Sequence, residues 1–215
     1  MHAERAQLRD DVRRNDAFIR AMHAVSHRAA PAVVDRVPLE GVRTLADLGG
    51  GPGHLLCEFL RRSERIEGYL VDLPLTLETA RRVLSDSPLL GRIRFMEWDL
   101  YDGPRPAELP PLDLALLSQV VHSESPERNR LLFGRLRDAL APGGRLVVRE
   151  NVVEEGRTSP PPAALFAVNM LAMTAEGRTY TEAEIVSWAE EAGFAFERGE
   201  RLDERSFLLT FRRPR

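Results

Sequence analysis

The sequence contains no lysine, because all 30 of its basic residues are arginine. A lysine base, a Schiff base or an ammonium ligand for phosphate is therefore excluded. We attribute this imbalance to a GC-rich coding bias, since loss of lysine is not the general signature of thermal adaptation. Against 33 acidic residues the net charge is −3. The chain thus has no broad positive field, and we expect neither nucleic acid nor a membrane as its partner.

Cysteine is nearly absent as well. Cys57 is the only one, so no internal disulfide can form, and we expect a reducing cytoplasmic compartment. No apolar run approaches the roughly 18 residues of a membrane span, and the charged N-terminus lacks the apolar segment of a secretory signal. With 43% hydrophobic and 29% charged residues, the 215-residue chain has the composition of one globular domain.

Short apolar strands alternate with helices along most of the chain. We predict strands at 44–48, 68–71, 93–96, 112–117, 145–150, 194–201 and 206–212. We predict helices at 15–30 (ended by Pro31), 53–63, 74–85, 126–140 (ended by the APGG at 141–144), 163–173 and 181–192. This alternation predicts an α/β fold with a mostly parallel sheet and a closing antiparallel pair. Ligands of such sheets bind beyond the carboxyl ends of the strands.

A glycine-rich turn, DLGGGPG, follows the first predicted strand and contains Gly49, Gly50, Gly51 and Gly53. Glycines permit a tight turn and the close approach of a ligand to the backbone. The dinucleotide fingerprint needs a sixth-position glycine where this sequence has His54. The observed G-x-G-x-G spacing is instead typical of S-adenosylmethionine-binding methyltransferases.

Acidic residues stand at the ends of the first three predicted strands. Asp72 follows Gly49 by 23 residues, the offset expected for a carboxylate that binds ribose hydroxyls. Asp99 follows the third strand, where an acid in this cofactor class usually meets the adenine amino group and an apolar neighbour, here Leu100, meets the ring. Asp47 precedes the glycine turn, and we expect it to support the amino group of the methionine moiety.

Taken in order, these motifs resemble the class I S-adenosylmethionine-dependent O-methyltransferases, specifically the plant phenolic (caffeic-acid-type) and bacterial secondary-metabolite and carotenoid enzymes. The similar segments are AFIRAMHAVS (17–26), TLADLGGGPGHLL (44–56), YLVDLP (69–74), 116–153 and 168–194. The resemblance implies a Rossmann-like fold with a seven-stranded sheet whose last strand is antiparallel. It also implies S-adenosylmethionine as cofactor, with Leu73 and Ser118 among its contacts, a small hydroxylated aromatic or polyene acceptor, and no metal.

His122 and Glu150 lie 28 residues apart, as in this family. If the predicted strands 112–117 and 145–150 are neighbours, both side chains reach the ligand edge of the sheet. The resemblance implies that His122 is the general base and that Glu150 orients its ring. The motif is incomplete, however. Ser123 and Glu124 replace the usual Asp-Trp, Ser118 stands where a lysine is often found, and Thr179, close to Glu176, stands where a second glutamate supports the histidine.

The resemblance also implies the walls of the acceptor pocket. Phe18 and Met22 fall on one face of the helix 15–30. The other wall residues lie on the helix 163–173: Phe166, Asn169, Met170 and Met173. We therefore divide the chain into a helical segment, 1–40, that packs on a methyltransferase domain, 41–215.

The family usually carries a further N-terminal winged-helix region that forms dimers and covers the pocket, whereas this sequence begins just before the connecting helix. The oligomeric state therefore stays open. Three descriptions of the chain also stay open: a minimal enzyme of the family, a chain that needs a partner, or a catalytic domain alone. Two further hypotheses stay open as well. Some relatives bind the cofactor without methyl transfer, in hydroxylation or decarboxylation chemistry, and a regulatory cofactor-binding subunit would share the same motifs. Nitrogen or sulfur acceptors also remain possible.

Overall fold

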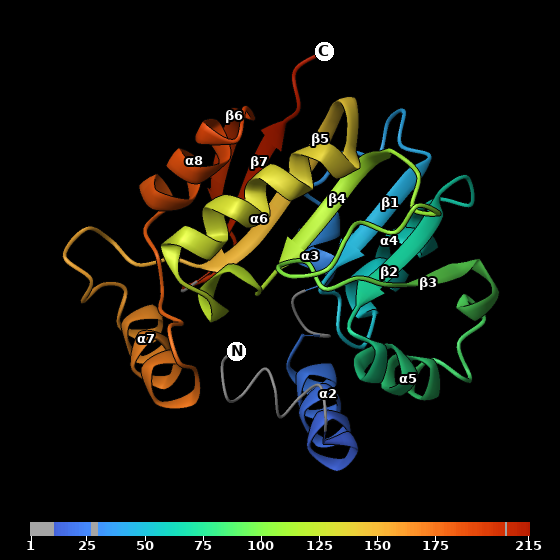
Figure 1. The fold of residues 1–215 in the computed structure, drawn as a ribbon, viewed down its shortest axis with the longest axis horizontal. Coiled ribbons are helices and arrows are strands. Elements are labelled where there is room, and N and C mark those ends of the chain that lie inside the picture. Colours follow the sequence, from blue (N-terminus) through green and yellow to red (C-terminus); the bar gives the residue numbers. More distant parts are fainter. Residues whose placement is uncertain (1–10, 27–29, 205) are drawn as a thin grey trace.

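The computed structural model describes residues 11–26, 30–204 and 206–215, with the side chains of 23–26 left out. In this part of the chain, seven strands form one sheet in the order β3-β2-β1-β4-β5-β7-β6 (Figure 1). The strands are β1 (Thr44–Leu48), β2 (Glu67–Asp72), β3 (Ile93–Glu97), β4 (Leu112–Ser118), β5 (Leu140–Asn151), β6 (Ala195–Arg201) and β7 (Ser206–Arg212). Only β7 runs antiparallel to its neighbours, which confirms the predicted sheet.

Helices cover both faces of the sheet (Figure 1). The helices are α2 (Val12–Ser26), α3 (Ala30–Val34), α4 (His54–Arg62), α5 (Pro74–Val83), α6 (Pro126–Ala139), α7 (Pro161–Met173) and α8 (Glu182–Glu191). Two short 3₁₀ turns are η1 (Leu90–Arg92) and η2 (Val121–Ser123). Side chains of α6 and α8 pack in the apolar core on one face, and those of α3, α4 and α5 form the core on the other. The central strands therefore send alternate residues into two different cores, whereas the edge strand β6 is almost entirely exposed.

Two predicted helix boundaries are wrong. The helix predicted for 15–30 begins earlier, at Val12, as α2, and its predicted end adjoins residues 27–29, which lie outside the described part of the chain. Pro31 lies within the helix α3 instead of ending a helix. The helix predicted to end at APGG ends at Ala139, since Leu140 is already extended and begins β5. Gly143, with φ 81°, lies inside that strand rather than after the helix.

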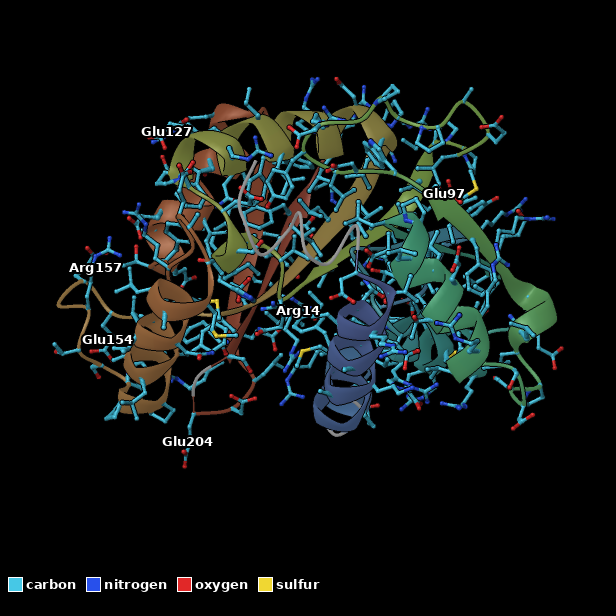
Figure 2. The ribbon with its side chains drawn as sticks, turned by 60° about the horizontal axis from the view of Figure 1, so that its bottom comes forward. Arg14, Glu97, Glu127, Glu154, Arg157 and Glu204 are labelled. Atoms are coloured by element: carbon cyan, nitrogen blue, oxygen red, sulfur yellow. The ribbon has the colours of Figure 1, made fainter. Side chains whose placement is uncertain are left out.

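The chain order places a switch point at the centre of the sheet. From β1 the chain proceeds outward through β2 and β3, then returns to place β4 on the other side of β1. The carboxyl ends of β1 and β4 therefore diverge into loops on opposite sides, which is where open α/β sheets bind ligands. Helices α2 and α7 flank these strand ends, as the turned view also shows (Figure 2). Along the described ranges, no helix combines the length and apolar character needed to cross a membrane.

Candidate active site

A cavity of about 1060 Å³ opens at the carboxyl ends of β1, β2 and β4, and α2 and α7 contribute its walls. Ligand pockets commonly measure about 300–1,000 Å³, so this cavity lies at the upper end of that range. Most of the residues predicted as site residues line it: Phe18, Met22, Asp47, Gly49, Gly50, Gly51, Asp72, Leu73, Leu100, Ser118, His122, Phe166, Asn169, Met170 and Met173.

The glycine turn is held against the end of β2. The backbone N–H of Gly49 donates to the carbonyl of Val71 at 2.8 Å. Asp72 accepts the N–H of Gly51 on Oδ2 at 2.9 Å and the N–H of Leu73 on Oδ1 at 2.7 Å. A Cβ on Gly50 would lie 2.6 Å from Cγ of Asp47, so no larger residue fits there without displacing that carboxyl. The turn and both acids therefore form one rigid unit.

Asp47 carries a buried carboxyl group at the base of the cavity. Its exposed fraction is 1%, and neither carboxylate oxygen accepts a hydrogen bond of normal length. Burial raises the pKa of Asp47 to about 7, with the backbone of Leu56 lowering it less and the nearby Asp72 charge adding to it. A buried carboxyl without a partner is costly when ionised. The position therefore suits a cationic ligand group that would compensate the charge.

Three predicted site residues do not line the cavity. Gly53 caps α4 in a left-handed conformation (φ 80°), and a Cβ there would lie 3.1 Å from side-chain atoms of Leu70 and Leu84. The Asp99 carboxylate accepts the N–H groups of Tyr101 and Asp102 at 3.0 and 3.3 Å and closes the turn after β3. Glu150 is fully buried beneath His122 rather than in the cavity wall.

His122 and Glu150 meet as predicted, because β4 and β5 are paired neighbours. Nδ1 of His122 lies 2.8 Å from Oε1 of Glu150, and the backbone N–H of His122 donates to Oε2 at 3.3 Å. The N–H of Asn151 donates to Oε1 at 2.7 Å. A carboxylate that accepts from Nδ1 fixes the tautomer and leaves Nε2 as the basic nitrogen. The ring of His122 is therefore held by Glu150 at the wall of the cavity.

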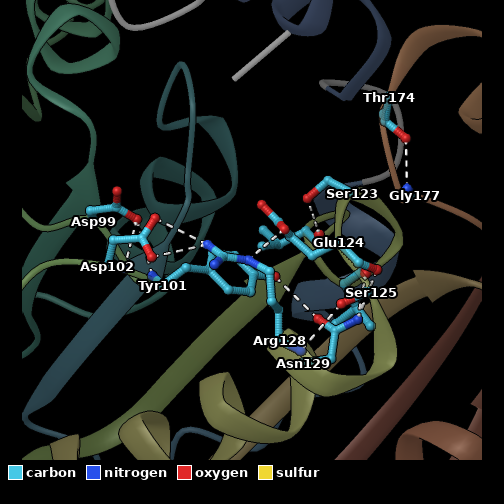
Figure 3. Close-up of polar contacts among 12 residues, drawn as sticks. Asp99, Tyr101, Asp102, Ser123, Glu124, Ser125, Arg128, Asn129, Thr174 and Gly177 are labelled. Atoms are coloured by element: carbon cyan, nitrogen blue, oxygen red, sulfur yellow. Dashed lines mark hydrogen bonds and ion pairs between the residues drawn. The ribbon is translucent and has the colours of Figure 1, made fainter. Parts of the chain in front are cut away.

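The loop that carries His122 is anchored from below (Figure 3). Asn129 is completely buried, and its Nδ2 donates to the carbonyls of Val121 at 2.9 Å and Glu124 at 3.3 Å. The buried hydroxyl of Tyr180 also donates to the Glu124 carbonyl. The N–H of Arg178 donates to the carbonyl of His122 itself, at 2.9 Å. These bonds fix the backbone of the loop, so the position of the imidazole depends little on the cavity contents.

The departures from the usual motif have local explanations. Glu124 is 1% exposed and lies 2.7 Å from Nε of Arg128, which also pairs with Asp102 at 3.0 Å (Figure 3). Ser123 donates to the carbonyl of Val120 at 2.7 Å. Thr179 is buried at 2% exposure and carries no charge. Glu150 is therefore the carboxylate that pairs with the His122 ring among the described residues.

Two helices, α2 and α7, form further walls of the cavity. Phe166 of α7 presents its ring edge-on to His122, with centroids 4.9 Å apart. On the opposite wall, α2 is held against α5 by a 3.2 Å hydrogen bond from Asn15 to Thr76 and a 3.1 Å ion pair between Asp16 and Arg82. These contacts place the apolar face of α2 toward the cavity.

Two residues that line the cavity at the ends of β4 and β5, Gln119 and Arg149, were not predicted from the sequence. Gln119 has φ 59°, unusual for a residue with a side chain, and its Oε1 accepts from Nδ2 of Asn151 at 2.9 Å. Arg149 lines the cavity beside Ser118. No sequence pattern predicts a positive φ at a glutamine. The sequence does show a charged pair, Arg149-Glu150, at the end of an apolar strand, but only Glu150 was predicted as a site residue.

Comparisons with known proteins agree with this geometry. The family described as an O-methyltransferase domain matches residues 5–195. The 3-hydroxy-5-methyl-1-naphthoate 3-O-methyltransferase of Streptomyces sahachiroi is 33% identical over 180 residues, covering 84% of this chain and 51% of the relative. The demethylspheroidene O-methyltransferase of Cereibacter sphaeroides is 34% identical over 159 residues, covering 74% and 41%.

Among solved structures, an O-methyltransferase family protein from Burkholderia thailandensis is 29% identical with a TM-score of 0.87, covering 98% of this chain and 63% of that one. The chain spans about half the length of the curated relatives it matches. The family match extends over most of the chain and includes the glycine turn, the strand-end acids and the His122 loop. The chain therefore belongs to the O-methyltransferase domain family.

Proposed function

We propose that this chain binds S-adenosylmethionine and transfers its methyl group to a hydroxyl of a small aromatic or polyene molecule. The observation that carries the proposal is the His122–Glu150 pair, joined at 2.8 Å, on the wall of a cavity that also contains the glycine turn and Asp47. A site for a positively charged group and an oriented base thus face the same space.

The described residues fit the cofactor. Asp47 is a buried carboxyl whose charge lacks compensation, and an ammonium group would supply it. Asp72 ends β2 beside the glycine turn, where its carboxylate is able to accept hydroxyl hydrogen bonds in addition to the two backbone N–H groups. Leu100 and Trp98 offer apolar surface to a flat ring on the same side of the cavity. When bound, the cofactor supplies an electrophilic methyl on a sulfonium, which is already a good leaving group.

The task of the protein is then to align the acceptor and to remove its proton. A phenol ionises only near pH 10, so a neutral imidazole beside its hydroxyl assists the attack. Glu150 holds the proton on Nδ1 of His122, so Nε2 is the atom that takes the proton of the acceptor. Phe166, Met170 and Phe18 line the wall with flat or adaptable apolar surface, which suits an aromatic acceptor.

The acceptor class is supported by the relatives named above, which act on a hydroxynaphthoate and on demethylspheroidene. We also propose a reducing compartment such as the cytoplasm, because Cys57 is buried as a free thiol.

The test uses purified protein, methyl-labelled S-adenosylmethionine and a panel of phenols, catechols and hydroxylated polyenes. We expect label in at least one product, and we expect His122→Ala to lower turnover by about 10²–10⁴-fold without changing cofactor affinity. Glu150→Gln should lower it less, because the ring stays in place while its tautomer is no longer enforced. Binding of the cofactor with no transfer to any acceptor would instead favour a relative that uses the cofactor without methyl transfer. Full turnover in His122→Ala with a neutral phenol would contradict the role of the base.

A further inference from the structure

We propose that Arg149 binds the carboxylate of the methionine moiety of the cofactor, a contact that no motif in the sequence assigns. The inference rests on the function proposed above. It concerns the half of the ligand that lies beyond Asp47, on the side of the cavity formed by β4 and β5.

The charges of the ligand and of the cavity lining support this assignment. The methionine moiety is a zwitterion, so a site that takes its ammonium also needs a cation or several donors for its carboxylate. The acids that line the cavity are Asp47, Asp72, Glu124 and Asp203. Among the described lining residues, Arg149 is the one arginine, and the sequence has no lysine. A carboxylate placed beside Asp47 without such a partner would be repelled, whereas a guanidinium offers paired hydrogen bonds to it.

The register of the sheet places Arg149 on the same face as Asp47. Asp47 pairs with Leu116 on β4, and Ser118, two residues further along β4, pairs with Arg149 on β5. Leu116 and Val147 lie in the core formed with α3, α4 and α5. Since side chains alternate along a strand, Asp47, Ser118 and Arg149 all leave the sheet on this same face.

The reach of the arginine side chain supports the assignment as well. Nη1 of Arg149 donates to Oγ of Ser118 at 3.4 Å, so this part of the guanidinium lies against the neighbouring strand β4. Two strand spacings, about 10 Å, separate β5 from β1. The arginine side chain and the amino-acid group of the ligand together span that gap. Asp203 also lines the cavity and adds a negative charge to its wall.

The experiment combines a variant with a matched ligand. Calorimetry would measure the affinity of S-adenosylhomocysteine and of its decarboxylated analogue, 5′-(3-aminopropylthio)-5′-deoxyadenosine, which keeps the amine. Arg149→Gln should weaken S-adenosylhomocysteine about tenfold to a hundredfold and leave the analogue nearly unchanged, because only the first ligand has the carboxylate. The control is Arg145→Gln, on the same strand and face, whose guanidinium donates to the carbonyl of Pro38. This control should bind both ligands as the wild type does.

Equal loss of both ligands in Arg149→Gln would overturn the inference, because it would show that Arg149 supports the fold of the cavity. Unchanged affinity for S-adenosylhomocysteine would overturn it as well. Arg149→Lys covers the case in which the glutamine variant does not fold. It keeps the charge, and it should still prefer S-adenosylhomocysteine over the analogue, although less than the wild type. Failure of the wild type to bind S-adenosylhomocysteine would refute the proposed function itself, which is a different result.

Discussion

The two halves of the cavity are built in different ways. On the half proposed for the cofactor (the cofactor half), charged groups sit at strand ends and are fixed by the backbone, as with the two N–H groups that hold Asp72. On the half proposed for the acceptor (the acceptor half), the walls are apolar side chains of α2 and α7, and Phe18 is 39% exposed while Met173 is 49% exposed. Strand ends share one scaffold and cannot move separately, whereas a helix that packs by one face has freedom to shift. The cofactor half should therefore be rigid and intolerant of change, and the acceptor half adaptable.

The outer side of α7 extends this contrast. Leu165, Val168 and Leu171 are 63–72% exposed, although apolar residues dominate the helix. In contrast, α4 beside the glycine turn buries Leu56, Cys57, Phe59 and Leu60. On the cofactor half, the buried charge of Asp47 destabilises the folded protein. On the acceptor half, the unfavourable feature is the exposed apolar surface of α7.

The largest expected effect concerns Asp47 and the pH dependence of stability. Its folded-state pKa of about 7 lies above the unfolded value of about 3.9. Between these values the folded protein holds a proton that the unfolded chain has lost, so stability falls as the pH rises from about 4 to about 7. Asp47→Asn should remove this penalty. Its stability advantage over the wild type should grow by about 4 kcal/mol between pH 4 and pH 8, measured by urea unfolding.

The same measurement with saturating S-adenosylhomocysteine provides the control. The ammonium of the ligand should compensate the ionised Asp47, so the ligand should stabilise the wild type at pH 8 more than it stabilises Asp47→Asn. A stability difference that does not change with pH would show that the carboxyl is not penalised by burial. The contrast between the two halves would then lose its energetic basis.

A smaller effect is expected at Asp72, which bonds to the backbone of the turn. Asp72→Asn replaces one acceptor oxygen with an amide donor, which would face the N–H of Gly51 or of Leu73. We expect the affinity for S-adenosylhomocysteine to fall about tenfold to a hundredfold, since hydrogen bonds to a charged acceptor contribute about 1.5–3 kcal/mol. Methylthioadenosine, which has the ribose but no amino-acid group, should lose as much. Loss confined to S-adenosylhomocysteine would place Asp72 at the wrong part of the ligand.

Sequence reasoning succeeded where backbone topology determines the position of a side chain. The family and the sheet are confirmed, and His122 meets Glu150 because β4 and β5 are neighbours. Sequence reasoning did not give the local geometry. Asp99 follows a strand as predicted, and Oδ1 of its carboxylate accepts the N–H of Tyr101 in its own loop, while its contact with the adenine stays a prediction. The start of α2 depends on packing against α5, which a single sequence does not show.

The smallest expected effect is at Phe18, on the acceptor half. Phe18→Leu keeps an apolar side chain and removes an aromatic face, and aromatic pairs contribute about 0.5–1.5 kcal/mol beyond their buried area. We expect the KM for an aromatic acceptor to rise about two- to tenfold, while the affinity for S-adenosylhomocysteine stays within about twofold. Phe196→Leu is the matched control, because Phe196 is similarly exposed, at 36%, but lies on β6 outside the cavity. It should leave both values unchanged. If Phe18→Leu instead weakened the cofactor as much as Asp72→Asn does, the two halves would be coupled, and α2 would act on the cofactor rather than on the acceptor alone.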